Sequence, residues 1–251
     1  MIEKIFFLIT VITILLLPGC SLEETANNSN TSLLKIIEEY ELDVPEPSGL
    51  TYDSHSNTLW TVSDRPDNKV YQIDFQGNIL TILNYQGEDL EGIEYDANDS
   101  TLWIIEEGER KLVHIDLNGN FLTSYNIQIE GLDNNGLEAN CIDDEHNFYL
   151  LNEKNPGLFI ELNSDFSIKS EIELTNCEDY SGMCFDKTRE GFWIVSDQSR
   201  KLFFYSIEHE IGVDYNLPFD KAEGVVYISE ESRFYIVSDS EQKLYVCEIN
   251  E

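Results

Sequence analysis

Two columns of acidic and hydroxyl side chains recur along the chain at a nearly regular interval. The first column is Ser48, Glu91, Glu138, Ser181 and Glu223, and a small residue follows each member. The second column is Asp64, Glu107, Glu153, Asp197 and Asp239. Carboxylate oxygens are the ligands that calcium prefers in proteins, and water and other neutral oxygens complete its shell. The two columns therefore indicate an oxygen-rich site built by repetition.

The three glutamates of the first column, Glu91, Glu138 and Glu223, are the predicted metal ligands. Carboxylates gathered at one narrow opening raise one another's pKa unless a cation or a donor neutralises them. Calcium takes about six to eight oxygens, and Ser48 and Ser181 can add to the set. We therefore predict calcium as the one cofactor of the site.

The second column has two interpretations, which the sequence leaves open. With Ser48 and Ser181 it can form a ligand-binding face. Alternatively, each acid can pair with a lysine across a short turn, because a lysine follows in four of the five repeats: Lys69, Lys111, Lys201 and Lys243. Such surface ion pairs contribute about 0–1 kcal/mol each.

Other kinds of chemistry find little support. The sequence has no G-x-S-x-G motif, no P-loop and no EF-hand loop. Of the four histidines, His55 and His146 fall in predicted turns, His114 in a strand and His209 in a polar stretch. The net charge of −34 repels phosphate backbones and so excludes direct nucleic-acid binding.

Five sequence repeats must position the two columns. They begin with SGLTYD, EGIEYD, EANCID, SGMCFD and EGVVYI, at residues 48, 91, 138, 181 and 223. Two further runs rich in Val, Ile, Phe, Tyr and Trp follow in each repeat, and a fourth follows in four of them, at 79–83, 121–127, 167–174 and 211–217. Four strands in a period of about 43 residues are typical of one propeller blade.

The fifth repeat ends without a fourth strand, and the run 34–42 before the first repeat can supply it. We therefore predict an all-β fold, a single β-propeller of about five four-stranded blades, with the ring closed by this N-terminal strand. A sixth blade remains open if 130–137 or the N-terminal segment holds further strands. Because the first two strands of a blade are antiparallel, both acidic columns should lie on one face, with the first around the channel mouth.

One aromatic residue recurs in the second strand of every repeat: Trp60, Trp103, Tyr149, Trp193 and Tyr235. Large rings at equivalent positions suit packing between blades better than ligand binding. The repeats contain four cysteines, Cys141, Cys177, Cys184 and Cys247. Their spacing is not that of a disulfide scaffold, and their pairing is left open.

The N-terminus reads as an export signal. An apolar run over 5–17 closes with Leu17-Pro18-Gly19-Cys20, which resembles the lipobox of bacterial lipoproteins. That resemblance implies a lipid on Cys20, an anchor in the membrane and, in a Gram-negative host, the outer membrane. An ordinary signal peptide is the alternative. We predict a signal peptide at 1–20, a flexible tether at 21–32 and the propeller at 33–251.

The segments EPSGLTYDSHSNTLWTVSD (46–64) and QGEDLEGIEYD (86–96) resemble the SdiA-regulated family of bacterial envelope propellers. The small-apolar-x-apolar-Asp opening of the repeats also resembles NHL-type propellers, and a looser likeness extends to calcium-dependent lactonases. The first resemblance implies an exported β-propeller without a defined reaction.

Three functions remain for such a protein. The first is a monomeric, envelope-anchored binding module without catalytic activity, for a protein or small-molecule ligand, with calcium at the acidic mouth. The second is a calcium-dependent hydrolase of lactonase or phosphoesterase type. The third is a structural or adhesive surface module. Fold alone cannot choose among them, because propellers carry unrelated functions.

Overall fold

The computed structural model describes residues 32–129 and 136–249, which belong to one compact unit, Thr31–Glu251. These residues form 21 strands and no helix. The predicted signal peptide, Cys20 and the tether up to residue 31 lie outside the described residues and stay predictions. In the described part, nothing helical is long and apolar enough to span a bilayer.

The strands fall into five sheets, one for each repeat. Blade 1 holds β3 (Pro47–Asp53), β4 (Thr58–Ser63), β5 (Val70–Ile73) and β6 (Ile79–Ile82). Blade 2 holds β7 (Leu90–Asp96), β8 (Thr101–Glu106), β9 (Lys111–Asp116) and β10 (Phe121–Asn126). Blade 3 holds β11 (Leu137–Ile142), β12 (Phe148–Asn152), β13 (Leu158–Leu162) and β14 (Ile168–Glu173). Blade 4 holds β15 (Gly182–Asp186), β16 (Gly191–Ser196), β17 (Lys201–Ser206) and β18 (Ile211–Asn216). Blade 5 holds β19 (Ala222–Ile228), β20 (Arg233–Ser238), β21 (Lys243–Glu248) and β2 (Lys35–Glu41).

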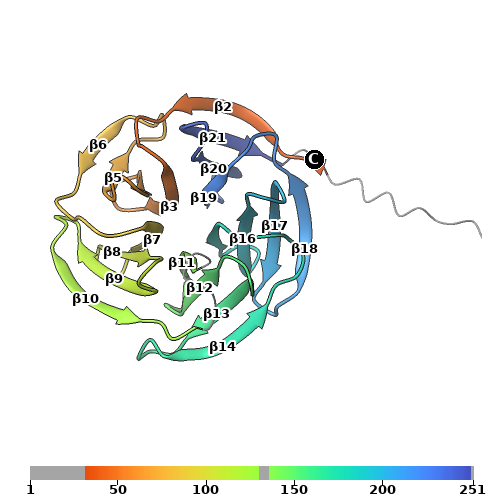
Figure 1. Cartoon of the computed structure of the whole chain (residues 1–251). Helices are drawn as coiled ribbons and strands as arrows, with labels where there is room; N and C mark the ends of the chain where they lie inside the picture. The colour runs from red at the N-terminus through yellow and green to blue at the C-terminus, as the bar shows by residue number, and fades with distance from the viewer. Residues whose placement is uncertain (1–31, 130–135, 250–251) are drawn as a thin grey trace, which may run out of the picture. The chain divides into compact units, whose positions relative to one another are not determined.

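The ring closes as the sequence predicts. Figure 1 shows the five blades around a centre, with β2 on the outside of the last blade. β2 pairs antiparallel with β21, so the N-terminal strand completes the C-terminal blade. The first strands of the blades, β3, β7, β11, β15 and β19, contact one another in turn around the axis. In addition, the short β1 (Ser32–Leu33) pairs parallel with β18 on blade 4.

Asx turns shape several hairpins between the strands. The Asp116 carboxylate accepts hydrogen bonds from the backbone N–H of Asn118 (2.8 Å) and of Asn120 (2.9 Å), and from the Asn120 side chain. Gly119 between them has φ 81°, which glycine adopts without steric cost. These bonds to the ionised form lower the pKa of Asp116 to about 2.

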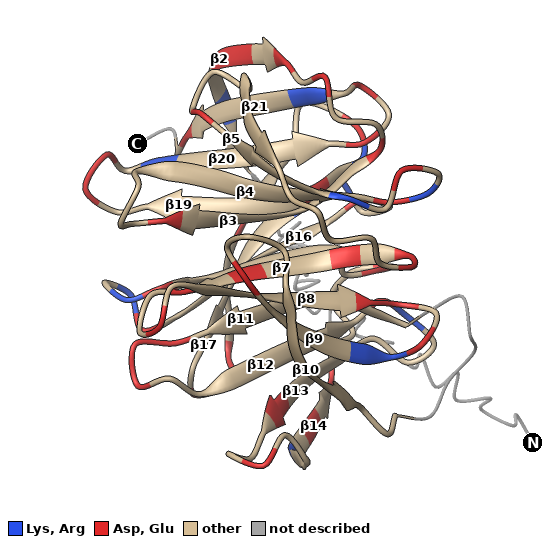
Figure 2. Ribbon diagram, turned by 90° about the vertical axis from the view of Figure 1, so that its left-hand side faces the viewer, with Lys and Arg blue, Asp and Glu red and all other residues tan. Residues whose placement is uncertain are grey.

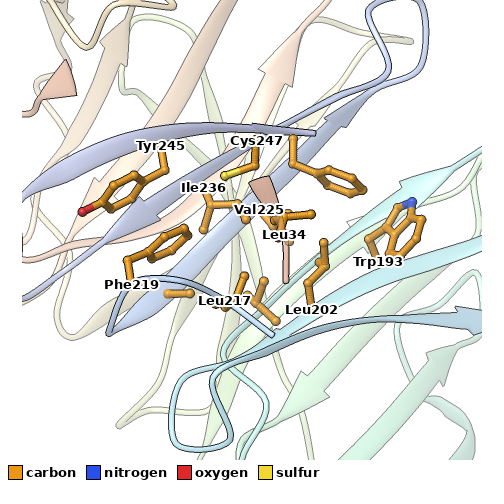
Figure 3. Close-up of a cluster of buried hydrophobic side chains, with 12 residues drawn as sticks. Leu34, Trp193, Leu202, Leu217, Phe219, Val225, Ile236, Tyr245 and Cys247 are labelled. Atoms are coloured by element: carbon orange, nitrogen blue, oxygen red, sulfur yellow. The ribbon is translucent and has the colours of Figure 1, made fainter. Parts of the chain in front are cut away.

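The hydrophobic core lies between neighbouring blades rather than in one central mass. Figure 3 shows the cluster between blades 4 and 5, where Trp193, Leu202 and Leu217 meet Val225 and Ile236. All five aromatic residues of the recurrent column are buried, as the packing interpretation predicts. Trp193 also donates its indole N–H to Asp186 (3.0 Å).

Acidic residues far outnumber basic ones, with 49 Asp and Glu against 15 Lys and Arg. Figure 2 shows Asp and Glu over many loops and strand ends, with far fewer Lys and Arg. The four cysteines of the described residues, Cys141, Cys177, Cys184 and Cys247, are all free. Cys141 and Cys247 are buried, which fits small apolar core positions.

Candidate functional site

β-bulges direct the first column of side chains toward the propeller axis. The pairing of β11 with β12 jumps from Leu137 to Ala139, so Glu138 is the extra residue. Glu223 holds the same place in β19, and Glu91 lies within a comparable shift in β7. Ser48 lies in the shift of β3, between Pro47 and Leu50. A bulge bends the strand and re-aims its side chain, which explains why these residues reach the opening.

The small residue after each first-column position permits close contact between blades. A Cβ on Gly49 would stand 2.5 Å from the backbone oxygen of Glu91. A Cβ on Gly182 would stand 2.2 Å from the backbone oxygen of Glu223. Neither distance is possible for a real side chain, so the inner strands can approach the axis only with glycine at these places.

Both columns meet at one cavity of about 220 Å³, which we call the acidic mouth. Each second-column residue directly follows the second strand of its blade, and the antiparallel pairing brings it beside the start of the first strand. The carboxylates that line the cavity are Glu46, Asp64, Glu91, Glu138, Glu153, Asp179, Asp197, Glu223 and Asp239. Lys154 and Lys221 are the cationic residues of this lining. Of the residues in the two predicted columns, Glu107 alone is outside it, directly beside Glu138 and Glu153.

Burial and mutual repulsion perturb these carboxyl groups. Burial, and then the charges of neighbouring carboxylates, hold the pKa of Glu138 well above its usual range. Glu91 has a raised pKa for the same reasons, although the Ser48 hydroxyl donates to its Oε2 (2.6 Å) and opposes the shift. Burial raises the pKa of Glu223 to about 8, and the Lys221 ammonium opposes it. The mouth therefore holds more negative charge than its own lysines neutralise.

Burial is also the first cause of a raised pKa at three aspartates of the mouth and at Glu107. The aspartates are Asp64, Asp179 and Asp239. The Gly136 N–H donates to Glu107 (2.9 Å) and partly opposes the shift there.

The four lysines of the turns do not pair with the second column, so that alternative is wrong. Lys69 pairs with Asp67, Lys201 with Asp214, and Lys243 with Glu39. Lys111 pairs with Glu106, its partner across the β8–β9 ladder, and not with Glu107. Successive side chains of a strand point to opposite faces, so a residue one place farther along points away from the lysine.

Two other lysines approach the second column from inside the mouth. The Lys221 ammonium lies 2.7 Å from Asp197 and 3.7 Å from Glu223. Lys154 bonds to Glu153. The Ser181 hydroxyl donates to the backbone oxygen of Ala222 (2.7 Å), so it is engaged with the backbone of the next blade.

Two trios of carboxylates each bring oxygens within 4.8 Å of one another. One trio is Asp64, Asp89 and Glu91, and the other is Glu107, Glu138 and Glu153. Glu91 and Glu138, which were predicted as ligands of one metal, thus belong to different trios, each with acids from outside the first column. Glu223, the third predicted ligand, has Lys221 beside it.

Sequence reasoning missed a third column that the repeats contain. The residues two places before the first column are Glu46, Asp89, Gly136, Asp179 and Lys221. Glu46, Asp179 and Lys221 line the mouth, Asp89 belongs to a trio, and Gly136 bonds to Glu107. Reading the same offset in every repeat would have found them, although their types differ from blade to blade.

The histidines have other partners. His55 bonds to the Tyr95 hydroxyl (2.8 Å), His146 to Asp96 (2.7 Å), and His114 stacks on Trp103 with ring centres 3.9 Å apart. No histidine is among the residues that line the acidic mouth. The mouth can therefore bind cations and exchange protons through carboxyl groups, without an imidazole base.

Solved structures similar to this chain are β-propellers and include enzymes of different activities. Myxococcus xanthus glutaminyl cyclase aligns with a TM-score of 0.70 at 10% identity, over 86% of this chain and 96% of that one. XC5397 from Xanthomonas campestris, described as a gluconolactonase, aligns with a TM-score of 0.58 at 11% identity, over 88% and 96%. Virginiamycin B lyase from Staphylococcus aureus aligns with a TM-score of 0.52 at 13% identity, over 84% and 88%. Likeness at these identities shows the fold alone.

The search among curated proteins finds no match to the sequence. The SdiA-regulated family model matches residues 33–212, which is most of the chain and most of the propeller. The segments 46–64 and 86–96, which carry the resemblance in the sequence, lie inside that match. The chain belongs to the SdiA-regulated family.

Proposed function

We propose that this protein is an exported, lipid-anchored binding module that uses the acidic mouth of its propeller to bind a divalent cation, calcium, and through it a ligand. The observation that carries the proposal is the charge of one cavity. In the part of the chain that the structure describes, nine carboxylates line it against two lysines, Lys154 and Lys221. Several of these acids have a raised pKa, so a bound cation would relieve repulsion that the folded chain retains.

Calcium suits this cavity better than a softer metal. Among the described residues, the lining offers carboxylates and no cysteine or histidine, which zinc and copper favour. Calcium accepts irregular sets of oxygen ligands and readily keeps some water, whereas magnesium demands a near-octahedral shell.

The cellular setting of the proposal rests on the sequence of the N-terminus. The lipobox-like Leu17-Pro18-Gly19-Cys20 supports lipidation of Cys20 and attachment to the envelope membrane. Metabolic labelling with a palmitate analogue tests this point. Label should appear in the protein and be absent from the Cys20→Ser variant.

Calcium binding is tested by thermal melting of the purified protein in EDTA and in millimolar calcium. A ligand that binds only the folded state raises the melting temperature. At a free ligand concentration of a hundred times the Kd, the free energy of unfolding increases by about 2.7 kcal/mol. We expect a clear rise with calcium and its reversal by EDTA. Identical melting curves in both buffers would remove the proposal and leave an adhesive or structural module.

A calcium-dependent hydrolase is the second candidate, and one observation favours it. Glu223 lines the mouth with a pKa of about 8, so it can carry a proton at neutral pH and act as a general acid beside a cation. A screen of lactones and phosphoesters with calcium tests this activity. Turnover that is lost in Glu223→Gln, with calcium binding retained, would make the protein an enzyme.

A further inference from the structure

The trio of Glu107, Glu138 and Glu153 lies off the propeller axis, between blades 2 and 3. Glu107 follows β8, Glu138 is the bulged residue of β11, and Glu153 follows β12. Each offers an oxygen within 4.8 Å of the other two. Only 7% of Glu107 and 8% of Glu138 are exposed, so this trio is more deeply buried than the one around Asp64.

The backbone of Gly136 holds the off-axis trio in place. Its N–H donates to Glu107 Oε1 (2.9 Å), and its carbonyl accepts from the N–H of Glu153 (2.9 Å). A Cβ at this position would meet Glu107 Cγ at 2.8 Å, so glycine is needed for the contact. One residue thus holds the carboxylate of Glu107 and the backbone of Glu153 at the site.

Glu138 points to a ligand by what it lacks. It is more than nine-tenths buried and lines the cavity, yet no described residue donates a hydrogen bond to its side chain or forms an ion pair with it. The charges nearest to it are carboxylates, those of Glu91 and Glu107 first. A buried carboxylate without a partner is costly, and native structures seldom keep one without a use.

Resting on the proposed function, we infer that the off-axis trio seats the divalent cation and that the ammonium of Lys154 is a tethered competitor for the same charge. Lys154 directly follows Glu153 and bonds to it. It neutralises one of the three carboxylates and leaves Glu138 unpaired. A hard cation gains all three acids, with water completing its shell, and Lys154 can turn outward because its side chain is long and flexible.

Calorimetric titration of the EDTA-stripped full chain with calcium chloride tests the inference. Glu138→Gln and Glu107→Gln should each weaken calcium binding at least about tenfold, since even the loss of a residue that only orients a metal ligand costs about 10–100-fold. Glu223→Gln should weaken it less, roughly threefold, because Glu223 lies outside the trio and would act on the cation only by electrostatic attraction over a longer distance. Glu161→Gln is the matched control, because Glu161 is also paired with a lysine, Lys169, but lies on β13 away from the mouth.

Lys154→Met tests the competitor directly. Removal of the ammonium should tighten calcium binding roughly threefold or more, whereas Lys169→Met should leave it unchanged. A second readout guards against misfolding, because Glu138→Gln removes a buried carboxyl group that has no partner among the described residues. Its melting temperature in EDTA should equal or exceed that of the parent protein.

The outcomes separate this inference from the proposed function. Calcium binding that survives Glu107→Gln and Glu138→Gln but is lost in Glu91→Gln or Glu223→Gln would overturn the off-axis site and leave the proposed function standing. No heat of binding by the parent protein at millimolar calcium would overturn both. Weaker binding by Lys154→Met would contradict the competitor role while the trio stands.

Discussion

At the scale of single residues, the acidic mouth is defined by buried carboxyl groups, and burial disfavours their ionised form. Glu91, Glu138 and Glu223 all have a raised pKa, and burial is the first cause for each. Elsewhere the protein stabilises ionised carboxylates, as at Asp116 in its turn. Burial also raises the pKa of Glu94, which lies outside the mouth, to about 8, so the raised values follow burial and are not a general result of the net charge.

This contrast predicts how stability depends on pH. A group whose pKa is higher in the folded state binds more protons when folded, so its stabilising effect exists at low pH and is lost as the pH rises. For Glu223 the window runs from its ordinary value, about 4.5, to about 8. In EDTA, the melting temperature should fall across this window, and Glu223→Gln should remove a share of order a few kcal/mol.

Thermal melts at several pH values in EDTA, with and without Glu223→Gln, measure this effect. Carboxylates with a lowered pKa, such as Asp116, act below the window and do not confuse it. Calcium should flatten the slope, because it favours the ionised acids. A melting temperature that climbs steadily from about pH 5 to about pH 8 in EDTA would contradict the burial of Glu223 in its protonated form.

At the scale of strands and turns, the sequence was sufficient for the blades but not for the details that make the site. Runs rich in Val, Ile, Phe, Tyr and Trp predicted the strands, and the run 34–42 predicted the closing strand β2 (Lys35–Glu41). The bulges at Glu138 and Glu223 were out of reach, because an inserted residue leaves the apolar pattern around it intact. The lysine pairing was wrong for a related reason: one step along a strand reverses the side-chain face.

The inner strands predict a sharp difference between two glycines. Gly182→Ala would press a Cβ against the Glu223 backbone oxygen at 2.2 Å, whereas a Cβ on Gly108 meets only a side-chain oxygen of Asp89, at 3.1 Å. We expect Gly182→Ala to destabilise the fold by about 1–3 kcal/mol or more, since backbone cannot yield as a side chain does. Gly108→Ala should cost clearly less.

Urea unfolding of both glycine variants measures the difference. The midpoint for Gly182→Ala should drop well below that of Gly108→Ala at an unchanged slope. Equal midpoints would mean that the inner strands are not as close to each other as the structure has them.

At the scale of the whole molecule, stability depends on closing the ring. Blade 5 takes three strands from the C-terminal part of the chain and one from the N-terminal part, so this blade is complete only when both parts pair. Leu34, between β1 and β2, is buried in the cluster shared by blades 4 and 5 (Figure 3). The family match and the repeat pattern identify the propeller, yet the seam depends on this short N-terminal stretch.

Leucines 33 and 34 offer a matched pair for testing the seam. Leu34 is 1% exposed and Leu33 is 53% exposed. Leu34→Ala should cost about 2–5 kcal/mol, as large-to-small changes in a core do. Leu33→Ala should stay within about 0.5 kcal/mol. Chemical unfolding measures both, and similar losses would show that the seam is not packed through Leu34.

The short parallel strand β1 has a mechanical consequence. The chain reaches the ring at β1 on the edge of blade 4, and the Leu34 N–H bonds to the Asn216 oxygen (2.9 Å) before β2 crosses to blade 5. Force applied to the chain ahead of residue 32 therefore acts first on the two-residue pairing of β1 with β18 and then on the pairing of β2 with β21. Tension from outside the domain would open the ring at its seam while the blades stayed folded, so the seam is the mechanically weakest point of the propeller.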